Sequence, residues 1–274
     1  NSTRFSACLS IEFQTCSIEY QGSAITMSRD KLLHTHASSP AAKRLREAML
    51  NYHDFQQQSK LDNIDHHLAK LAHWQSERLK FSHRDFYQSS DYQDGLSFLF
   101  TDLYSTEDFS DRDRDLERIF PKMIKLLPKK ILETVSLLVE LNLLTQQLDQ
   151  RLAEIIFIEH NSNELNEKIY CEAYRASDNH GQRLYQIQLT SQLGQKLDKY
   201  ARSSVILFTL RMTEGAAEMA GLQALHQFLM TGFEAFHSMK DVRTLMNTLS
   251  ERETVYLDEI YQGNNHPFNF DLSI

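Results

Sequence analysis

The residue pattern with the most distinctive chemistry is a run of alternating acids and arginines between Asp108 and Arg118. If this run is helical, its apolar residues share one face, and the cations Arg114, Arg118 and Lys122 line another. A basic stripe can contact an anion or an RNA backbone, whereas the same charges on a solvated helix form only i,i+3 and i,i+4 ion pairs. Acids lie among the bases, and the chain has a formal net charge of −8 at pH 7. We therefore expect a solvated helix face and not a nucleic-acid site.

We expect the same segment to have a structural role. Ser110 followed three residues later by Asp113 approximates a capping box, which would start a helix. Arg112 points about 160° away from the basic stripe, toward the apolar side, so it needs a carboxylate or carbonyl partner if it is buried. Asp102 and Asp108 are the nearest acids in the sequence that could supply one. The complete expected motif comprises Asp102, Tyr104, Asp108, Ser110, Arg112, Asp113 and Arg118.

A second pattern is a stripe of methionines and histidines between Met212 and His237, whose sulfur and imidazole donors could bind copper or haem. Its candidate ligands are His226, Met230, Glu234 and His237. His226 and His237 lie roughly 16 Å apart along a helix, which is too far to share one metal. Glu234 and His237 have the Glu-x-x-His spacing of half a di-iron site, but no second such motif occurs in the sequence. We therefore expect a packing surface of methionines and no bound metal.

A third cluster comprises His66, His67 and His73 with Asp62 and Asp65. Asp62 and His66 are one helical turn apart and could hold one edge of a metal site, but polar residues cover most of this stretch, so we expect a solvated face. The chain contains no glycine-rich phosphate loop, nucleophile elbow or His-Glu-x-x-His motif. We therefore predict no catalytic residue and no cofactor, and we expect a protein that is not an enzyme.

The elements that position these residues are predicted to be helices. The 274 residues include only 8 Gly and 4 Pro, and none of the prolines lies between Pro128 and Pro267, which favours helices over a β-sandwich or a Rossmann sheet. Apolar residues recur with a 3.6-residue period, which indicates a single globular all-α bundle of about ten helices. Cys8, Cys16 and Cys171 form no Cys-x-x-Cys pair, so we expect a reducing compartment and a cytoplasmic location.

The chain is expected to divide into a poorly ordered leader over 1–38, a helical domain over 39–262 and a C-terminal tail over 263–274. Two phenylalanines in the tail could dock back onto the helical domain. Residues 1–26 precede the first methionine, so they are either sequence upstream of a natural start or the remnant of a longer chain. The longest uncharged run in the helical region, Met219–Phe233, is shorter than the roughly 18 residues that suggest a membrane span, so we expect no membrane partner.

The element most informative about packing is a helix expected over 214–238. Small residues gather on one side of it, where they allow a neighbouring backbone to approach closely. These small residues are Ala217, Ala220, Gly221, Ala224, Gly232 and Ala235. Leucines and phenylalanines cover a second side, which leaves little room for a solvent-exposed face. We therefore expect this helix to be central and buried, and we expect Gly221→Leu to force two backbones apart.

Residues 97–128 carry a family resemblance. They begin Ser-Phe-Leu-Phe-Thr-Asp-Leu-Tyr and continue through Asp-Phe-Ser-Asp-Arg-Asp. The segment resembles a family of bacterial proteins of unknown function that is named for an FFLEELY motif followed by an Asp-Phe-Ser-x-Arg-Asp run. The first half departs from that motif and the second half matches it. The later stretches 174–176, 220–222 and 232–236 are also similar, so the likeness covers residues 74–260. It implies a helical, cytoplasmic bacterial protein and supplies no catalytic residues.

Together these patterns favour a non-catalytic helical protein that acts through protein interaction or regulation, with another protein or a second copy of itself as its partner. The alternative is a helical protein that binds a small molecule or a metal between its helices, as ferritin-like and haem-oxygenase-like proteins do. The acidic net charge argues against a nucleic-acid partner. An absorbance spectrum and a metal analysis of protein purified without chelator distinguish the two hypotheses.

Overall fold

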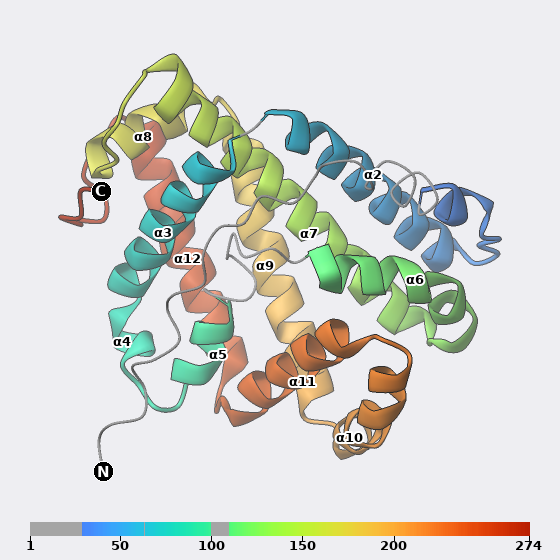
Figure 1. Ribbon diagram of the computed structural model, residues 1–274. Coiled ribbons are helices and arrows are strands. Elements are labelled where there is room, and N and C mark those ends of the chain that lie inside the picture. The colour runs from blue at the N-terminus through green and yellow to red at the C-terminus, as the bar shows by residue number, and fades with distance from the viewer. Residues whose placement is uncertain (1–28, 63, 100–109) are drawn as a thin grey trace, which may run out of the picture.

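Helices pack side by side around three long central ones (Figure 1). The computed structural model describes residues 29–62, 64–99 and 110–274, and of residues 60–62, 110–114 and 126 it describes the backbone only. Within this part of the chain there are helices and turns but no strand, which confirms the prediction of an all-α bundle. None of the helices in the described ranges is long and apolar enough to cross a membrane.

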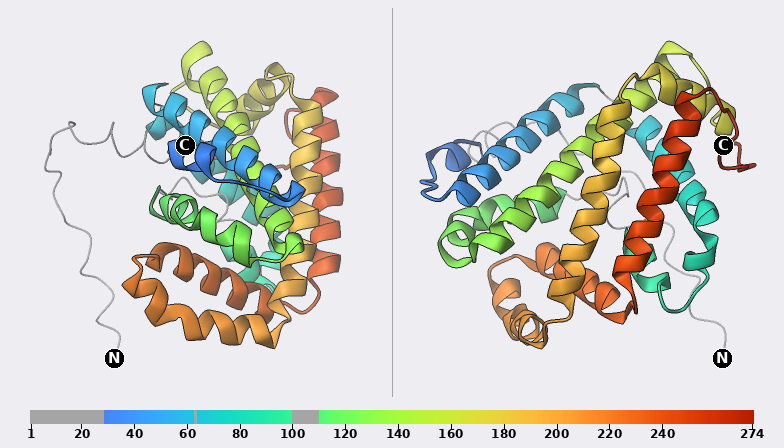
Figure 2. Two further views of the ribbon diagram at one scale, coloured as in Figure 1. Left: turned by 90° about the vertical axis from the view of Figure 1, so that its right-hand side faces the viewer. Right: turned by 180° about the vertical axis from the view of Figure 1, so that it is seen from behind.

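The three central helices are α7 (Lys129–Ala153), α9 (His180–Ala201) and α12 (Val242–Tyr261). They lie next to one another, with α9 between the other two (Figure 2). Neither Pro nor Gly occurs between Pro128, which precedes α7, and Gly181, so nothing in the sequence interrupts α7 before its end. The helix then widens into a π-helical turn, η2 (Glu154–Glu159).

Helix α2 (Pro40–Asp62) packs along the outer side of α7. The residues just before α2 also pack against this part of the fold. Residues 29–34 are helical, and Leu32 is buried in a cluster with Leu45 and Phe120. The expected poor order up to residue 38 is therefore wrong for residues 29–38, because Leu32 gives this stretch an apolar anchor that its polar composition obscures. The expectation for residues 1–28 lies outside the described residues.

The remaining helices before α9 surround the central three. They are α3 (Asp65–Ser82), α4 (Arg84–Tyr87), α5 (Gln93–Ser97), α6 (Ser110–Leu126) and α8 (Glu167–Ala176). The side chain of Asn166 caps α8 by accepting a hydrogen bond from the Ile169 amide at 3.0 Å.

The C-terminal tail is part of the core. Phe268 is buried, and the indole of Trp74 donates to the carbonyl of Leu272 at 3.0 Å. The main chains of Leu165 and Ile274 exchange two hydrogen bonds at 2.8 and 3.0 Å. These contacts hold the tail against α3 and α8. The two phenylalanines in the tail had suggested such docking from the sequence alone.

The prediction of a single buried helix over 214–238 is wrong. Two helices, α10 (Ser204–Met219) and α11 (Gln223–Ser238), form a hairpin there (Figure 2). Gly221 has a φ of +62° and ends α10, because this left-handed conformation is accessible to glycine without strain. Every residue of α10 is described and none is buried, so α10 lies at the periphery.

Gly221 is also not a close-contact position. The atoms nearest to a Cβ built on it belong to the Arg118 guanidinium and lie 3.6 Å away, so a substitution there is opposed by backbone strain and not by overpacking. The close contact is at Gly232, where a Cβ would lie 2.7 Å from the ring of Phe98. Phe98 is itself buried, so its ring has little room to move.

We predict that Gly232→Ala lowers the free energy of unfolding by about 1–3 kcal/mol, because the added methyl overpacks the contact with Phe98. Gly181→Ala is the matched control, since a Cβ there meets nothing within 4 Å. That change should raise stability by about 0.5–1 kcal/mol through the helix propensity of alanine. Urea unfolding of the two variants checks both signs, and a neutral or stabilising Gly232→Ala would contradict the close packing of α11 against Phe98.

Candidate functional site

A cavity of about 100 Å³ lies among α3, α7, α8, α9 and α12. Its polar lining includes Gln75, Arg78, His83, Asp149, Arg183 and Glu253, together with the phenols of Tyr170 and Tyr174. Its apolar lining includes Leu79, Ile187, Met246 and Leu257. Charged side chains around an interior cavity are expensive to bury, so their partners decide what the cavity can do.

The charge of Arg78 is closely compensated, although its Nε, like other buried donors of the site, has no hydrogen-bond partner among the described residues. Its side chain is buried, and its Nη1 donates to both carboxylate oxygens of Glu253 at 2.6 and 2.7 Å. His83, which is 0% exposed, donates to the same carboxylate through its Nε2 at 2.8 Å. The guanidinium also lies over the ring of Phe268 at 4.6 Å, so the C-terminal tail forms part of the site.

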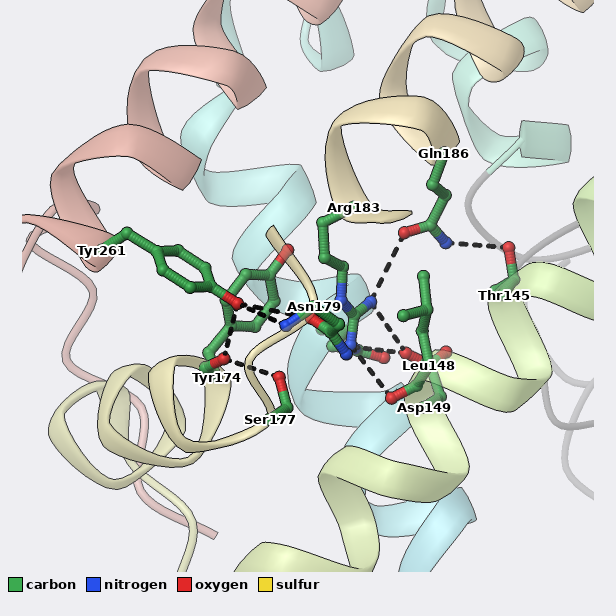
Figure 3. Close-up of polar contacts among 10 residues, drawn as sticks. Thr145, Leu148, Asp149, Tyr174, Ser177, Asn179, Arg183, Gln186 and Tyr261 are labelled. Carbon is green, nitrogen blue, oxygen red and sulfur yellow. Dashed lines mark hydrogen bonds and ion pairs between the residues drawn. The ribbon is translucent and has the colours of Figure 1, made fainter. Parts of the chain in front are cut away.

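Arg183 is held much more loosely (Figure 3). It is 3% exposed, yet its Nη1 lies 3.4 Å from Asp149 and 3.4 Å from the amide oxygen of Gln186. Its shortest hydrogen bond, at 3.1 Å, goes to the carbonyl of Leu148. The Nε of Arg183 has no hydrogen-bond partner among the described residues. A charge-assisted bond between a guanidinium and a carboxylate is normally about 2.7–2.9 Å long, so Arg183 lacks a close anion.

The pKa values of Glu253 and Asp149 are shifted in opposite directions. Burial would raise the pKa of the Glu253 carboxyl, but the charge of Arg78 and the hydrogen bond from His83 outweigh it and lower that pKa to about 2. Burial raises the pKa of Asp149, and the charge of Arg183 and the hydrogen bond from Gln75 offset only part of the increase. Glu253 therefore stays ionised beside Arg78, whereas burial makes the ionised form of Asp149 less favourable than that of an ordinary aspartate.

Neighbouring side chains fix the position of Arg183. Its guanidinium stacks on the ring of Tyr174 at 4.6 Å. Gln186 donates to the hydroxyl of Thr145 at 2.8 Å, which orients its amide oxygen toward Arg183. Tyr261 donates to the Tyr174 carbonyl at 3.2 Å and thereby ties α12 to α8 (Figure 3).

The chemistry of this arrangement is that of binding. Burial raises the pKa of the Tyr170 and Tyr174 phenols, so both remain neutral at physiological pH. Burial also raises the pKa of the Cys171 thiol to about 12, which keeps this nearby cysteine out of the reactive thiolate form. What the described cavity offers a ligand is a guanidinium N–H group and an apolar wall.

The residues of the expected Asp108–Arg118 motif are only partly described. Asp102, Tyr104 and Asp108 lie outside the described residues. Ser110, Arg112 and Asp113 lie in α6 with their side chains undescribed, so the prediction for Arg112 stays a prediction.

Arg118, at the end of the expected motif, has a structural contact. It pairs with Asp115 at 3.0 Å and donates to the carbonyl of Gly221. Asp115 in turn accepts a hydrogen bond from the Leu225 amide at 3.4 Å. This part of α6 therefore holds the turn between α10 and α11.

The histidines proposed as metal candidates contact main-chain carbonyls. The Nε2 of His226 bonds the carbonyl of Leu210 in α10 at 2.9 Å, and the Nδ1 of His237 bonds that of Ala201 in α9 at 2.8 Å. They attach α11 to its neighbours. The other two candidates, Met230 and Glu234, lie on the same helix as both histidines. Among the described residues, no group of three or more His, Cys, Asp or Glu side chains is placed to hold a metal.

The expected cluster around His66 does not converge on a site either. The imidazole of His67 stacks on the ring of Phe157 with 4.8 Å between the ring centroids, so His67 packs against η2. Only the backbone of Asp62 is described.

Sequence reasoning missed the two arginines of the cavity. A signal for Arg78 was available, since it lies four residues after Trp74 and seven after Leu71 and therefore interrupts the apolar stripe of α3. Nothing comparable marks Arg183 or Asp149, whose burial follows from how α7 and α9 meet.

Comparison with known proteins gives one match. A family model described as a domain of unknown function, DUF8198, matches residues 54–267. That range contains every polar residue of the cavity lining. No curated protein and no solved structure matches the chain.

We predict that Glu253→Gln lowers the free energy of unfolding by about 3–5 kcal/mol at pH 7, because it leaves the buried Arg78 without a carboxylate. The pKa of Glu253 is below its ordinary value of 4.5, so its stabilising effect is complete above that pH and is lost as the pH falls toward 2. The stability difference between wild type and variant should therefore shrink over this range.

Urea unfolding at pH 7, 4 and 3 measures this difference. Glu251→Gln on the exposed side of α12 is the control and should change stability by less than about 0.5 kcal/mol. A Glu253→Gln variant that is as stable as wild type at pH 7 would rule out the assigned ion pair.

Proposed function

The chain belongs to the family of the domain of unknown function DUF8198, and from the geometry of its cavity we propose that it binds a small organic carboxylate beside Arg183. The proposal assigns binding and no reaction. Binding of a small molecule between helices was the alternative hypothesis from the sequence, and the ligand proposed now is neither a metal nor a haem.

The observation that carries the proposal is the incomplete pairing of Arg183. A buried guanidinium whose nearest carboxylate is 3.4 Å away, and whose Nε donor has no partner among the described residues, is costly to the fold. A carboxylate in the adjoining cavity would accept from the Arg183 guanidinium in the charge-assisted geometry that guanidinium groups favour.

The size and lining of the cavity narrow the ligand class. A cavity of about 150 Å³ holds benzene, so the 100 Å³ available here suits a ligand of about four to six non-hydrogen atoms. Leu79, Ile187 and Leu257 line the cavity together with the polar groups, which suits a short alkyl chain attached to the carboxylate. Acetate, propionate and butyrate fall in this range, whereas a nucleotide or a haem does not.

A route from solvent is supported by the residues between α9 and α12. Ser191 and Ser250 line the cavity and are only half-buried, so this part of the lining lies near the surface. Binding there would add a second negative charge near Asp149, whose raised pKa favours proton uptake in response.

We predict that short monocarboxylates bind with millimolar to micromolar dissociation constants, within the limit of about 1.5 kcal/mol per non-hydrogen atom for very small ligands. Isothermal titration with acetate, propionate and butyrate measures this, with inorganic phosphate as the comparison anion. Arg183→Gln should weaken binding by at least about tenfold, since it removes the charged donor. Arg151→Gln, at an exposed arginine of α7, should leave it unchanged.

A second variant keeps both cavity arginines. Ser250→Leu extends an apolar side chain from α12 into the cavity and should abolish binding while the circular dichroism spectrum and the unfolding midpoint stay near those of wild type. Binding that survives both Arg183→Gln and Ser250→Leu, or no binding of any of the three carboxylates to wild type, would contradict the proposal.

A further inference from the structure

An apolar surface runs the full length of α10. Val205, Phe208, Met212 and Met219 are 71%, 66%, 68% and 87% exposed. Their spacing of three, four and seven residues places them on one face, and Gly215 occupies the remaining position of the same heptad pattern. We call these five residues the α10 seam. A helix of 16 residues is about 24 Å long, so the seam is long enough for a helix partner.

The fold of the monomer does not require this seam. The opposite side of α10 already packs inward, where Ile206, Leu207 and Leu210 contact the cluster around Phe98 and Phe236. Exposed apolar side chains gathered on one helix face are uncommon in a soluble monomer and mark an interaction surface.

We propose that the α10 seam binds the α10 seam of a second copy of this chain, with the two helices antiparallel. A twofold axis between Met212 and Gly215 would place Met212 of each copy opposite Gly215 of the other. The glycine has open space above it, since a Cβ built there meets nothing within 4 Å, and it leaves room for the methionine side chain. The same axis brings Phe208 opposite Met219, a favourable sulfur–aromatic pair.

The charges of α10 fit the same arrangement. Arg211 and Glu218 lie on one flank of the seam, seven residues apart. An antiparallel pair brings like flanks together, so Arg211 of each copy faces Glu218 of the other. A parallel pair would instead place Phe208 against Phe208 and Gly215 against Gly215, which leaves a clash and a gap. Size and charge therefore both select the antiparallel dimer.

The expected dimer is weak, because one pair of helices buries less than the roughly 800 Å² per partner of a standard interface. Sedimentation velocity of the full chain from about 1 to about 200 µM covers the range expected for such an interface. We expect a shift from monomer to dimer across this range. Met212→Glu should abolish the shift without loss of helicity, because this residue is 68% exposed in the monomer.

Charge exchange tests the orientation. Arg211→Glu and Glu218→Arg should each weaken the dimer at least about threefold, and the double variant should restore it, as expected for an attractive pair across an interface. Glu214→Gln is the control, since this residue of α10 lies away from the seam. A chain that stays monomeric at about 200 µM, a dimer that tolerates Met212→Glu, or a double exchange that fails to restore association would overturn the proposal.

Discussion

Two guanidinium groups lie inside a helical core, and the charge of each has to be compensated there. Transfer of an isolated charge from water to the protein interior costs several kcal/mol even after relaxation, so the surrounding helices must supply anions or carbonyls in the right places. Arg78 in α3 obtains a carboxylate from α12. Arg183 in α9 obtains a distant carboxylate and a carbonyl from α7. Arg78 therefore links α3 to α12, and Arg183 links α9 to α7.

The C-terminal tail depends on a further buried charge. Glu167 is 4% exposed and accepts hydrogen bonds from the amides of Phe268 and Phe270 at 2.7 and 2.9 Å. These bonds place Phe268 over the Arg78 guanidinium and complete one wall of the cavity. The tail is thus part of the site, and the cavity is lined by residues nearly 200 positions apart in the sequence, such as Arg78 and Phe268.

The fold class followed from local properties, whereas the site did not. Few glycines and prolines and a 3.6-residue period were enough to predict an all-α protein, since both act within single helices. The break at Gly221 was missed because its neighbours continue the apolar period on both sides, so only the positive φ separates α10 from α11. The burial of Arg183 was missed because a polar residue on a helix is buried by its neighbours in space, and periodicity does not identify those neighbours. The carbonyl contacts that the histidines of α11 make with α9 and α10 were beyond sequence reasoning, because they depend on which helices become neighbours.

Arg183 lines a small cavity, lacks a close anion and has one N–H donor, at Nε, without a partner among the described residues. Two-dimensional nitrogen–proton NMR of the arginine Nε–H groups observes that donor directly, with the Arg183 signal assigned from its loss in Arg183→Lys. We expect the signal to move on titration with propionate and to saturate at one ligand per chain, while the Arg78 signal moves less because Glu253 already balances the charge of its guanidinium at Nη1. An Arg183 signal that stays in place while propionate is raised to saturation would contradict the account.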